Sequence, residues 1–83
     1  MDRKEIEKKV IQSTSIVMKK DPSMITIATR FNQDLKMSSM KAVLLTALLE
    51  DEFQKKYPMA MVMKNQTIGD CVDMVVNSLE VRE

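Results

Sequence analysis

The residues best suited to chemistry are two adjacent serines, Ser38 and Ser39, at the point where a loop gives way to an amphipathic helix. Ser38 is a favourable N-cap, so its hydroxyl is expected to accept a hydrogen bond from a backbone N–H of the first turn. Ser39 then occupies the first helical position, with its hydroxyl free and facing solvent. A free hydroxyl there can carry a covalently attached group. On local features alone, an ordinary serine pair at a helix start is the simpler explanation.

Composition argues against most other chemistries. The 83 residues contain no histidine, which removes the commonest general base and the commonest metal ligand. The single cysteine, Cys71, excludes an intrachain disulfide and a cysteine-based zinc site. No nucleophile–base pair can be assembled, so an enzyme is not expected. A single cysteine favours a cytoplasmic protein. The charged residues that follow Met1 do not lead into the apolar core of a signal peptide, which favours the same location.

Charge and hydropathy limit the partners. The chain has 13 basic and 12 acidic residues and a net charge of +1, which gives no general attraction to nucleic acid or anionic membrane. No apolar run approaches the length of about 20 residues that spans a bilayer. Basic residues gather in the first helix, as in some small DNA-binding domains, but Asp2, Glu5 and Glu7 balance them. No helix is rich in the residues that read bases, so that function is disfavoured.

Capping signals define the first helix. Asp2 and Glu5 stand at capping-box spacing, and the apolar periodicity continues to about Lys20, where Asp21-Pro22 ends the helix. Residues 21–37 are predicted to form a long ordered loop whose apolar side chains pack on the helices. A short strand over residues 24–29 fits the alternation, but there is no second strand to pair with it.

The second helix runs from Ser38 or Ser39 to Phe53 and is apolar over most of its surface, which predicts burial on several sides or a partner on one. A short helical turn should follow Pro58. The last helix opens at Thr67 with Asp70 at capping-box distance. Its apolar stripe consists of Ile68, Val72, Val75 and Leu79, and residues 81–83 are expected to fray.

These elements predict an all-α fold. It is a small four-helix bundle with three main helices, one short helix and a long first loop, in a single domain over residues 1–83. Aromatic residues are only 4% of the chain, so aliphatic side chains and the nine methionines are expected to fill the core.

One run of the sequence resembles a family hallmark. Residues 34–40 read Asp-Leu-Lys-Met-Ser-Ser-Met, which is similar to the Asp-Leu-Gly-x-Asp-Ser-Leu motif of the acyl carrier proteins. The helix that follows ends Glu-Asp-Glu-Phe at residues 50–53, as the family's helix commonly ends in acidic residues and Phe. Residues 67–75 resemble the family's last helix. The resemblance spans roughly residues 31–75 and implies the acyl-carrier-like version of the four-helix bundle.

The resemblance implies a function for Ser39. In the family the motif serine is joined by a phosphodiester to 4′-phosphopantetheine from coenzyme A, and the thiol of this arm carries acyl groups as thioesters. The chain would then be an acyl carrier protein in fatty acid, lipid or polyketide-type biosynthesis, acting as a monomer and not as an enzyme. Its partners would be a phosphopantetheinyl transferase, the acyl-loading and acyl-processing enzymes, and the acyl chain itself, with no nucleic acid or membrane.

The resemblance also assigns two groups of residues. Partner recognition falls on the helix that follows the serine, and the acyl pocket falls between that helix and the short third one. Plain core is an equally good explanation of the pocket residues. The recognition residues are Met40, Lys41, Leu44, Glu50 and Asp51. The pocket residues are Phe31, Leu45, Thr46, Leu49, Val62, Ile68 and Cys71.

The chain departs from the family pattern at several positions. Ser38 replaces the motif's Asp, Lys36 replaces its Gly, and Lys41 and Leu44 dilute the usual acidity of the recognition helix. The near-neutral charge predicts apolar docking and a specialised carrier. The same departures leave open a second interpretation, a carrier-fold interaction module that has lost the arm.

Overall fold

The computed structural model describes residues 1–80 as four α-helices and one 3-10 helix. In chain order these are α1 (Arg3–Met18), η1 (Pro22–Met24), α2 (Ser39–Phe53), α3 (Met59–Met63) and α4 (Ile68–Glu80). The all-α class is confirmed, and no strand occurs within residues 1–80, where Arg30 and Thr67 form an isolated antiparallel bridge. The prediction of fraying for residues 81–83 lies outside the described residues.

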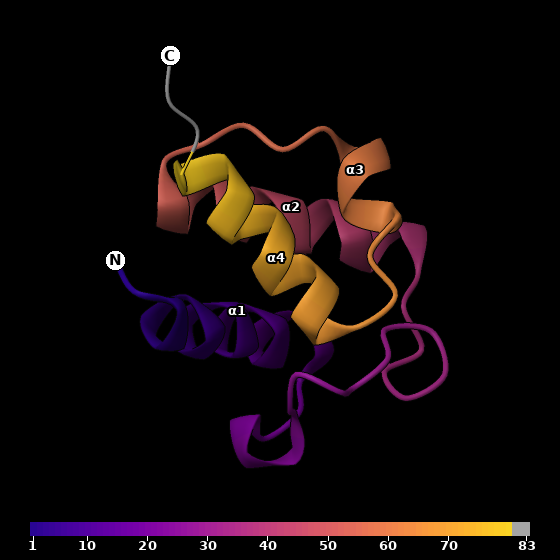
Figure 1. Ribbon diagram of the computed structural model, residues 1–83. Coiled ribbons are helices and arrows are strands. Elements are labelled where there is room, and N and C mark those ends of the chain that lie inside the picture. Colours follow the sequence, from indigo (N-terminus) through magenta and orange to yellow (C-terminus); the bar gives the residue numbers. More distant parts are fainter. Residues whose placement is uncertain (81–83) are drawn as a thin grey trace.

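The three long helices enclose the core. α1 packs against both α2 and α4, and α3 packs on α2. In Figure 1, α4 crosses in front of α2, with α1 below them, and the loop between α1 and α2 passes beneath α4. The chain between α2 and α3 runs along the opposite edge of the bundle. This arrangement leaves the start of α2 at one end of the molecule, beside α3.

Local capping explains where α1 begins and ends. Asp2 accepts a hydrogen bond from the Glu5 backbone N–H at 2.9 Å, as the predicted cap requires. The helix ends at Met18, two residues before the predicted end, because Lys19 adopts the left-handed conformation at φ 57°. Gln54 closes α2 in the same way at φ 54°. With one glycine in the chain, other residues must occupy these positions.

The core is aliphatic with few methionines. Val10, Leu49, Ile68, Val72 and Val75 are each 0% exposed. The predicted stripe of α4 is therefore buried along most of its length. Of the nine methionines only Met18 belongs to the buried core, while others are exposed on α2 and α3. The expectation that methionines fill the core is wrong, because most of them lie on faces that the bundle does not cover.

Backbone hydrogen bonds attach the long loop to the start of α4. The Ile27 carbonyl accepts from Gly69 N–H at 2.8 Å, and the Thr29 carbonyl accepts from Ile68 N–H at 2.9 Å. Gly69 is the only glycine in the sequence, and a Cβ there would lie 3.1 Å from the Ile27 carbonyl oxygen. The loop is thus ordered, as predicted, and its close approach to α4 explains the glycine.

Candidate functional site

The two serines at the start of α2 have different roles. Ser38 is the N-cap, with extended backbone (φ −130°, ψ 167°), and its hydroxyl accepts a hydrogen bond from Lys41 N–H at 3.2 Å. Ser39 is the first helical residue and is exposed. The structure therefore places the Ser39 hydroxyl where a bulky group could be attached without disturbing the cap. No acidic residue lies in the first turn of α2.

The turn before Ser38 is built around Asp34. Its carboxylate accepts from the Arg30 N–H at 2.9 Å, and this bond, reinforced by the Arg30 side chain, lowers the pKa of Asp34. Leu35 is buried against the core. Lys36 then adopts the left-handed conformation at φ 55°, a conformation that glycine adopts most readily. The lysine that replaces the motif glycine has therefore kept a glycine-like backbone geometry.

An exposed apolar surface follows Ser39 along α2. Met40 is 76% exposed, and Val43 and Leu44 are about half exposed. The sequence assigned Met40 and Leu44 to partner recognition but missed Val43, although its spacing of three residues from Met40 places both on one helix face. α3, which packs on α2, adds the exposed residues Met61 and Met63. Lys41, which was also assigned to recognition, lies between Met40 and Val43 in the sequence and is half-buried.

The acidic end of α2 is largely engaged within the protein. The Glu50 carboxylate accepts a hydrogen bond from Tyr57 N–H at 2.7 Å. Glu52 pairs with Lys9 of α1, with 2.8 Å between Nζ and Oε2. Asp51 is exposed and forms no ion pair among residues 1–80. Of the two acidic residues assigned to recognition, Glu50 thus holds the chain that leads to α3, whereas the exposed Asp51 does not.

A small cavity lies between the loop, α2 and α3. Its volume is about 50 Å³, and its walls include Phe31, Leu45 and Val62 from the predicted acyl pocket. Met37 and Ala42, which flank Ser39 in sequence, also line it, so the cavity lies beside the start of α2. The other predicted pocket residues do not line it. Thr46 donates to the Ala42 carbonyl at 2.7 Å, and Leu49, Ile68 and Cys71 are core residues with 0% exposure.

Burial also makes Cys71 unreactive. Removal of the thiol from water, with a smaller contribution from the nearby Asp70 charge, raises the pKa of Cys71 to about 12. A thiol with so high a pKa is almost entirely protonated at neutral pH, and the thiol is a poor nucleophile. Cys71 therefore belongs to the packing of α4 and does not line the small cavity, although it was predicted to be a pocket residue.

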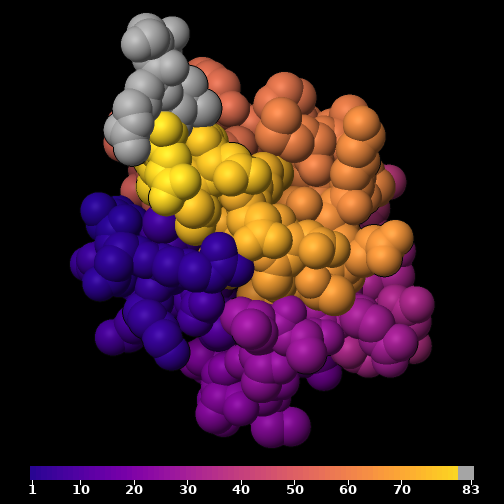
Figure 2. Space-filling model, in the orientation of Figure 1, coloured from indigo at the N-terminus to yellow at the C-terminus, as the bar shows by residue number. Residues whose placement is uncertain are grey.

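A larger open groove lies between α4, α3 and the chain that joins α2 to α3. Its volume is about 750 Å³, and Tyr57, Met61, Met74 and Asn77 are among its lining residues. Figure 2 shows α3 and α4 side by side on this face of the molecule. The sequence did not reveal this groove, because its walls come from segments whose apposition depends on the packing of α4.

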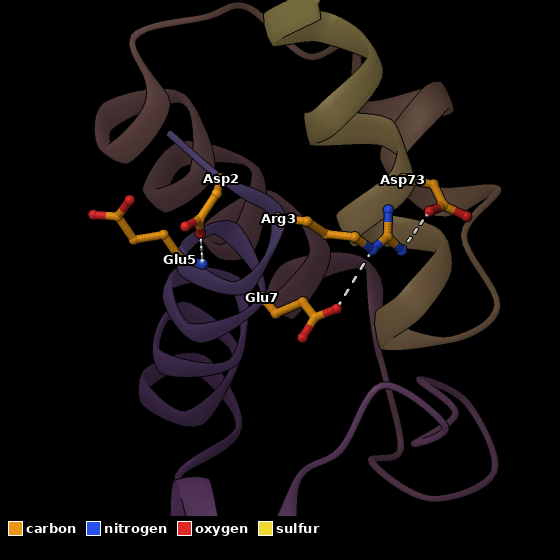
Figure 3. A network of polar contacts seen from close by, with 5 residues as sticks. All are labelled: Asp2, Arg3, Glu5, Glu7 and Asp73. Atoms are coloured by element: carbon orange, nitrogen blue, oxygen red, sulfur yellow. Dashed lines mark hydrogen bonds and ion pairs between the residues drawn. The ribbon is translucent and has the colours of Figure 1, made fainter.

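Arg3 fixes α1 against α4 near this groove. Its guanidinium donates to Asp73 at 2.7 Å and lies 3.4 Å from the Glu7 carboxylate (Figure 3). The hydrogen bond to Asp73, strengthened by both carboxylates, raises the pKa of Arg3. Asp73 also lines the groove. This network is structural, and residues 1–80 contain no cluster of acidic or cysteine side chains able to hold a metal ion.

None of the helices in residues 1–80 combines the length and apolarity needed to cross a bilayer. The longest, α1, has 16 residues and carries charged side chains along its exposed face.

Comparison with known proteins finds matches over most of the chain. The family described as "Phosphopantetheine attachment site" matches residues 8–75. The acyl carrier protein of Borrelia garinii subsp. bavariensis is 36% identical over 75 residues, which cover 90% of this chain and 94% of that protein. The acyl carrier protein of Rickettsia canadensis is 34% identical over 70 residues, covering 84% and 81% respectively.

Proposed function

Because the chain belongs to the acyl carrier protein family, we propose that it carries acyl groups as thioesters on a 4′-phosphopantetheine arm attached to Ser39. The observation that supports this position most directly is the division of roles between two neighbouring hydroxyls. Ser38 caps α2, and Ser39 is exposed at its first position. One hydroxyl is thereby available for a phosphodiester while the other stabilises the helix. The remainder of residues 1–83 serves as one domain that presents this serine.

The electrostatics at the start of α2 favour a phosphodiester. The first backbone N–H groups of a helix lack intrahelical partners and lie at the positive end of its dipole, so they attract anions. The first turn of α2 has no acidic residue, and Lys41 lies two positions after Ser39. The replacement of the motif Asp by Ser38 also removes a negative charge beside the phosphate. The arm's phosphate would therefore meet no repulsion from this helix.

The exposed face of α2 would bind the partner enzymes. Met40, Val43 and Leu44 provide an apolar centre, with Lys41 beside it and Asp51 at the far end. Since Glu50 and Glu52 are engaged within the protein, docking should depend mainly on apolar burial. The partners we expect are a phosphopantetheinyl transferase and enzymes that load and process acyl groups. A face this poor in free acidic charge suits a specialised carrier in fatty acid, lipid or polyketide-type biosynthesis.

Intact mass after incubation with coenzyme A and a phosphopantetheinyl transferase tests the attachment site. We expect the wild-type chain to gain the mass of one arm and Ser39→Ala to gain none. Ser38→Ala is the matched control, because it removes the neighbouring hydroxyl and should still gain one arm. Melting curves of all three proteins establish that each is folded.

Two outcomes would contradict the proposal. If the Ser39→Ala variant gained the mass of one arm, the attachment site would be another residue. A folded wild-type protein that gains no arm, even with the transferase from its own source, would indicate a carrier-fold interaction module that has lost the arm.

A further inference from the structure

Asn65 forms part of the wall of two separate spaces. It lines the small cavity of about 50 Å³ beside the start of α2, and it also lines the open groove of about 750 Å³ between α3 and α4. Met37 and Met63 border the small cavity, whereas Met61 and Met74 border the groove. Asn65 therefore borders both the interior space nearest Ser39 and a much larger space beside α3 and α4.

The sizes of the two spaces limit what each can hold. Sites that enclose molecules of drug size have volumes of roughly 300–1,000 Å³. The small cavity is far below this range, so a short acyl group is the most it can shelter. The groove lies within the range. A longer chain that continued into the core would have to displace buried side chains, since Leu49, Ile68 and Cys71 have 0% exposure.

Asn65 is held only weakly in its position. Its side-chain amide donates to the Met74 sulfur at 3.5 Å, and no other hydrogen bond of this side chain occurs among residues 1–80. A thioether is a weak acceptor, so little free energy is lost when the amide turns toward solvent. Both members of the contact border the groove. The neighbouring helix α3 has five residues and no side-chain cap at its start, so few interactions resist a small adjustment there.

We propose that Asn65 is a gate between these spaces, and that an acyl chain too long for the small cavity passes it and extends into the groove between α3 and α4. This inference rests on the proposed attachment of the arm to Ser39. It assigns the groove to the distal part of a long acyl chain, with Met61, Met74 and Tyr57 supplying apolar contacts. The other lining residues include the charged side chains Lys55, Lys56, Lys64, Asp70 and Asp73. A short acyl group would remain beside Met37 and Met63.

Methionine methyl NMR can follow the path of the chain. The holo protein, labelled with ¹³C at the methionine methyl groups, is loaded with butanoyl, octanoyl or dodecanoyl groups, and mass spectrometry confirms each loading. We expect butanoyl to shift the methyl resonances of Met37 and Met63 alone. Dodecanoyl should also shift those of Met61 and Met74. Single Met→Leu variants assign the resonances.

Variants of Asn65 test the gate itself. Asn65→Ala should allow a shorter chain to shift Met61 and Met74 than the wild type requires, and Asn65→Phe should abolish those shifts while keeping the ones at Met37 and Met63. Gln12→Ala is the control, since Gln12 is exposed on α1 and lines neither space. It should behave as the wild type.

The outcomes separate this inference from the proposed function. A dodecanoyl protein whose Met61 and Met74 resonances do not shift would overturn passage into the groove and leave the attachment site intact. Shifts that are unaffected by both Asn65 variants would overturn the gate. Failure to gain an arm would overturn the attachment site and this inference together.

Discussion

Thr67 and Asp70 exchange two hydrogen bonds at the start of α4. The Thr67 hydroxyl oxygen accepts from Asp70 N–H at 3.1 Å, and the Asp70 carboxylate accepts from Thr67 N–H at 3.2 Å. The same carboxylate oxygen accepts from Gln66 N–H at 3.0 Å. This is the capping box that the sequence predicted, and it lies next to the residues that bind the long loop to α4.

Thr67→Ala is expected to lower the free energy of unfolding by about 1 kcal/mol, because the Asp70 N–H loses its acceptor. Urea denaturation followed by circular dichroism measures the change. Ser39→Ala is the control, since Ser39 is exposed and its hydroxyl is not the cap of its helix. Equal stability of Thr67→Ala and wild type would show that the cap contributes nothing.

The engagement of the acidic end of α2 predicts weak salt dependence of docking. With Glu52 paired to Lys9 and Glu50 bound to Tyr57 N–H, Asp51 is the residue of this end left for a partner. Added salt should weaken binding to a partner enzyme by no more than about fivefold, the equivalent of one exposed ion pair of about 1 kcal/mol. Calorimetry at several salt concentrations measures this. A much steeper fall would indicate charge-driven docking.

Lys36→Gly is expected to raise the free energy of unfolding by roughly 0.5–1 kcal/mol, since a left-handed conformation is strained for lysine and not for glycine. The backbone φ of Lys36 is 55°. Lys36→Ala is the matched control, because it removes the charge and keeps a Cβ at the same backbone position. If both variants change stability equally, the effect belongs to the lysine side chain and not to the backbone.

Thr14 carries a buried hydroxyl without a partner. Its side chain is 0% exposed, and its Oγ1 forms no hydrogen bond among the residues that the structure describes. Thr14→Val should therefore raise the free energy of unfolding by about 1 kcal/mol, because a desolvated polar group is replaced by a methyl of similar shape. Ser13→Ala, one residue away on the same helix, tests whether any polar-to-apolar change in α1 has this effect. A lower melting temperature for Thr14→Val would contradict the prediction.

The raised pKa of Cys71 predicts lower stability in alkali. Above a pH of about 8.5 the thiol of the unfolded chain loses its proton. The folded protein retains that proton until its pKa of about 12. Over this range the free energy of unfolding should fall by at most about 1.4 kcal/mol per pH unit from this group, with no effect at lower pH.

Cys71→Ala tests the origin of this pH dependence. The variant should be less stable at neutral pH, because it leaves a cavity, but its decline between those pH values should be shallower. Tyr57, whose pKa is raised mainly by burial, is present in both proteins, but Cys71 also helps to raise the pKa of Tyr57, so the variant removes both contributions of the thiol. Parallel declines would show that the thiol is not responsible.

The starts of the helices were predictable because caps are local. Asp2, Ser38 and Thr67 each accept a hydrogen bond from a residue three positions along, so a few adjacent letters contain the whole interaction. The position of Ser39 followed from the same signal. The family motif then supplied what the local pattern could not, which is the group expected on that hydroxyl.

The rest depended on packing between distant segments. The bond between Lys9 and Glu52 joins residues 43 positions apart, and no local pattern marks it. Which methionines are exposed depends on how the helices pack, since Met40 lies on α2 and Met61 and Met63 on α3. Only three of the seven predicted pocket residues border the small cavity. The place where space is left empty depends on how side chains from distant segments pack, and the sequence does not encode this directly.

The bonds between the long loop and α4 affect how freely this sequence can vary. The Ile27 and Thr29 carbonyls accept hydrogen bonds from the start of α4 at 2.8 and 2.9 Å, and Phe31 N–H donates to the Gln66 carbonyl, just before α4, at 2.9 Å. Backbone donors and acceptors persist through nearly every substitution, since only proline lacks the N–H. The segment that positions Ser39 can therefore accumulate mutations in its exposed side chains while the serine stays in register. Gly69 is the exception in this contact, because a Cβ there would lie 3.1 Å from the Ile27 carbonyl oxygen, so a side chain should be tolerated poorly at that position.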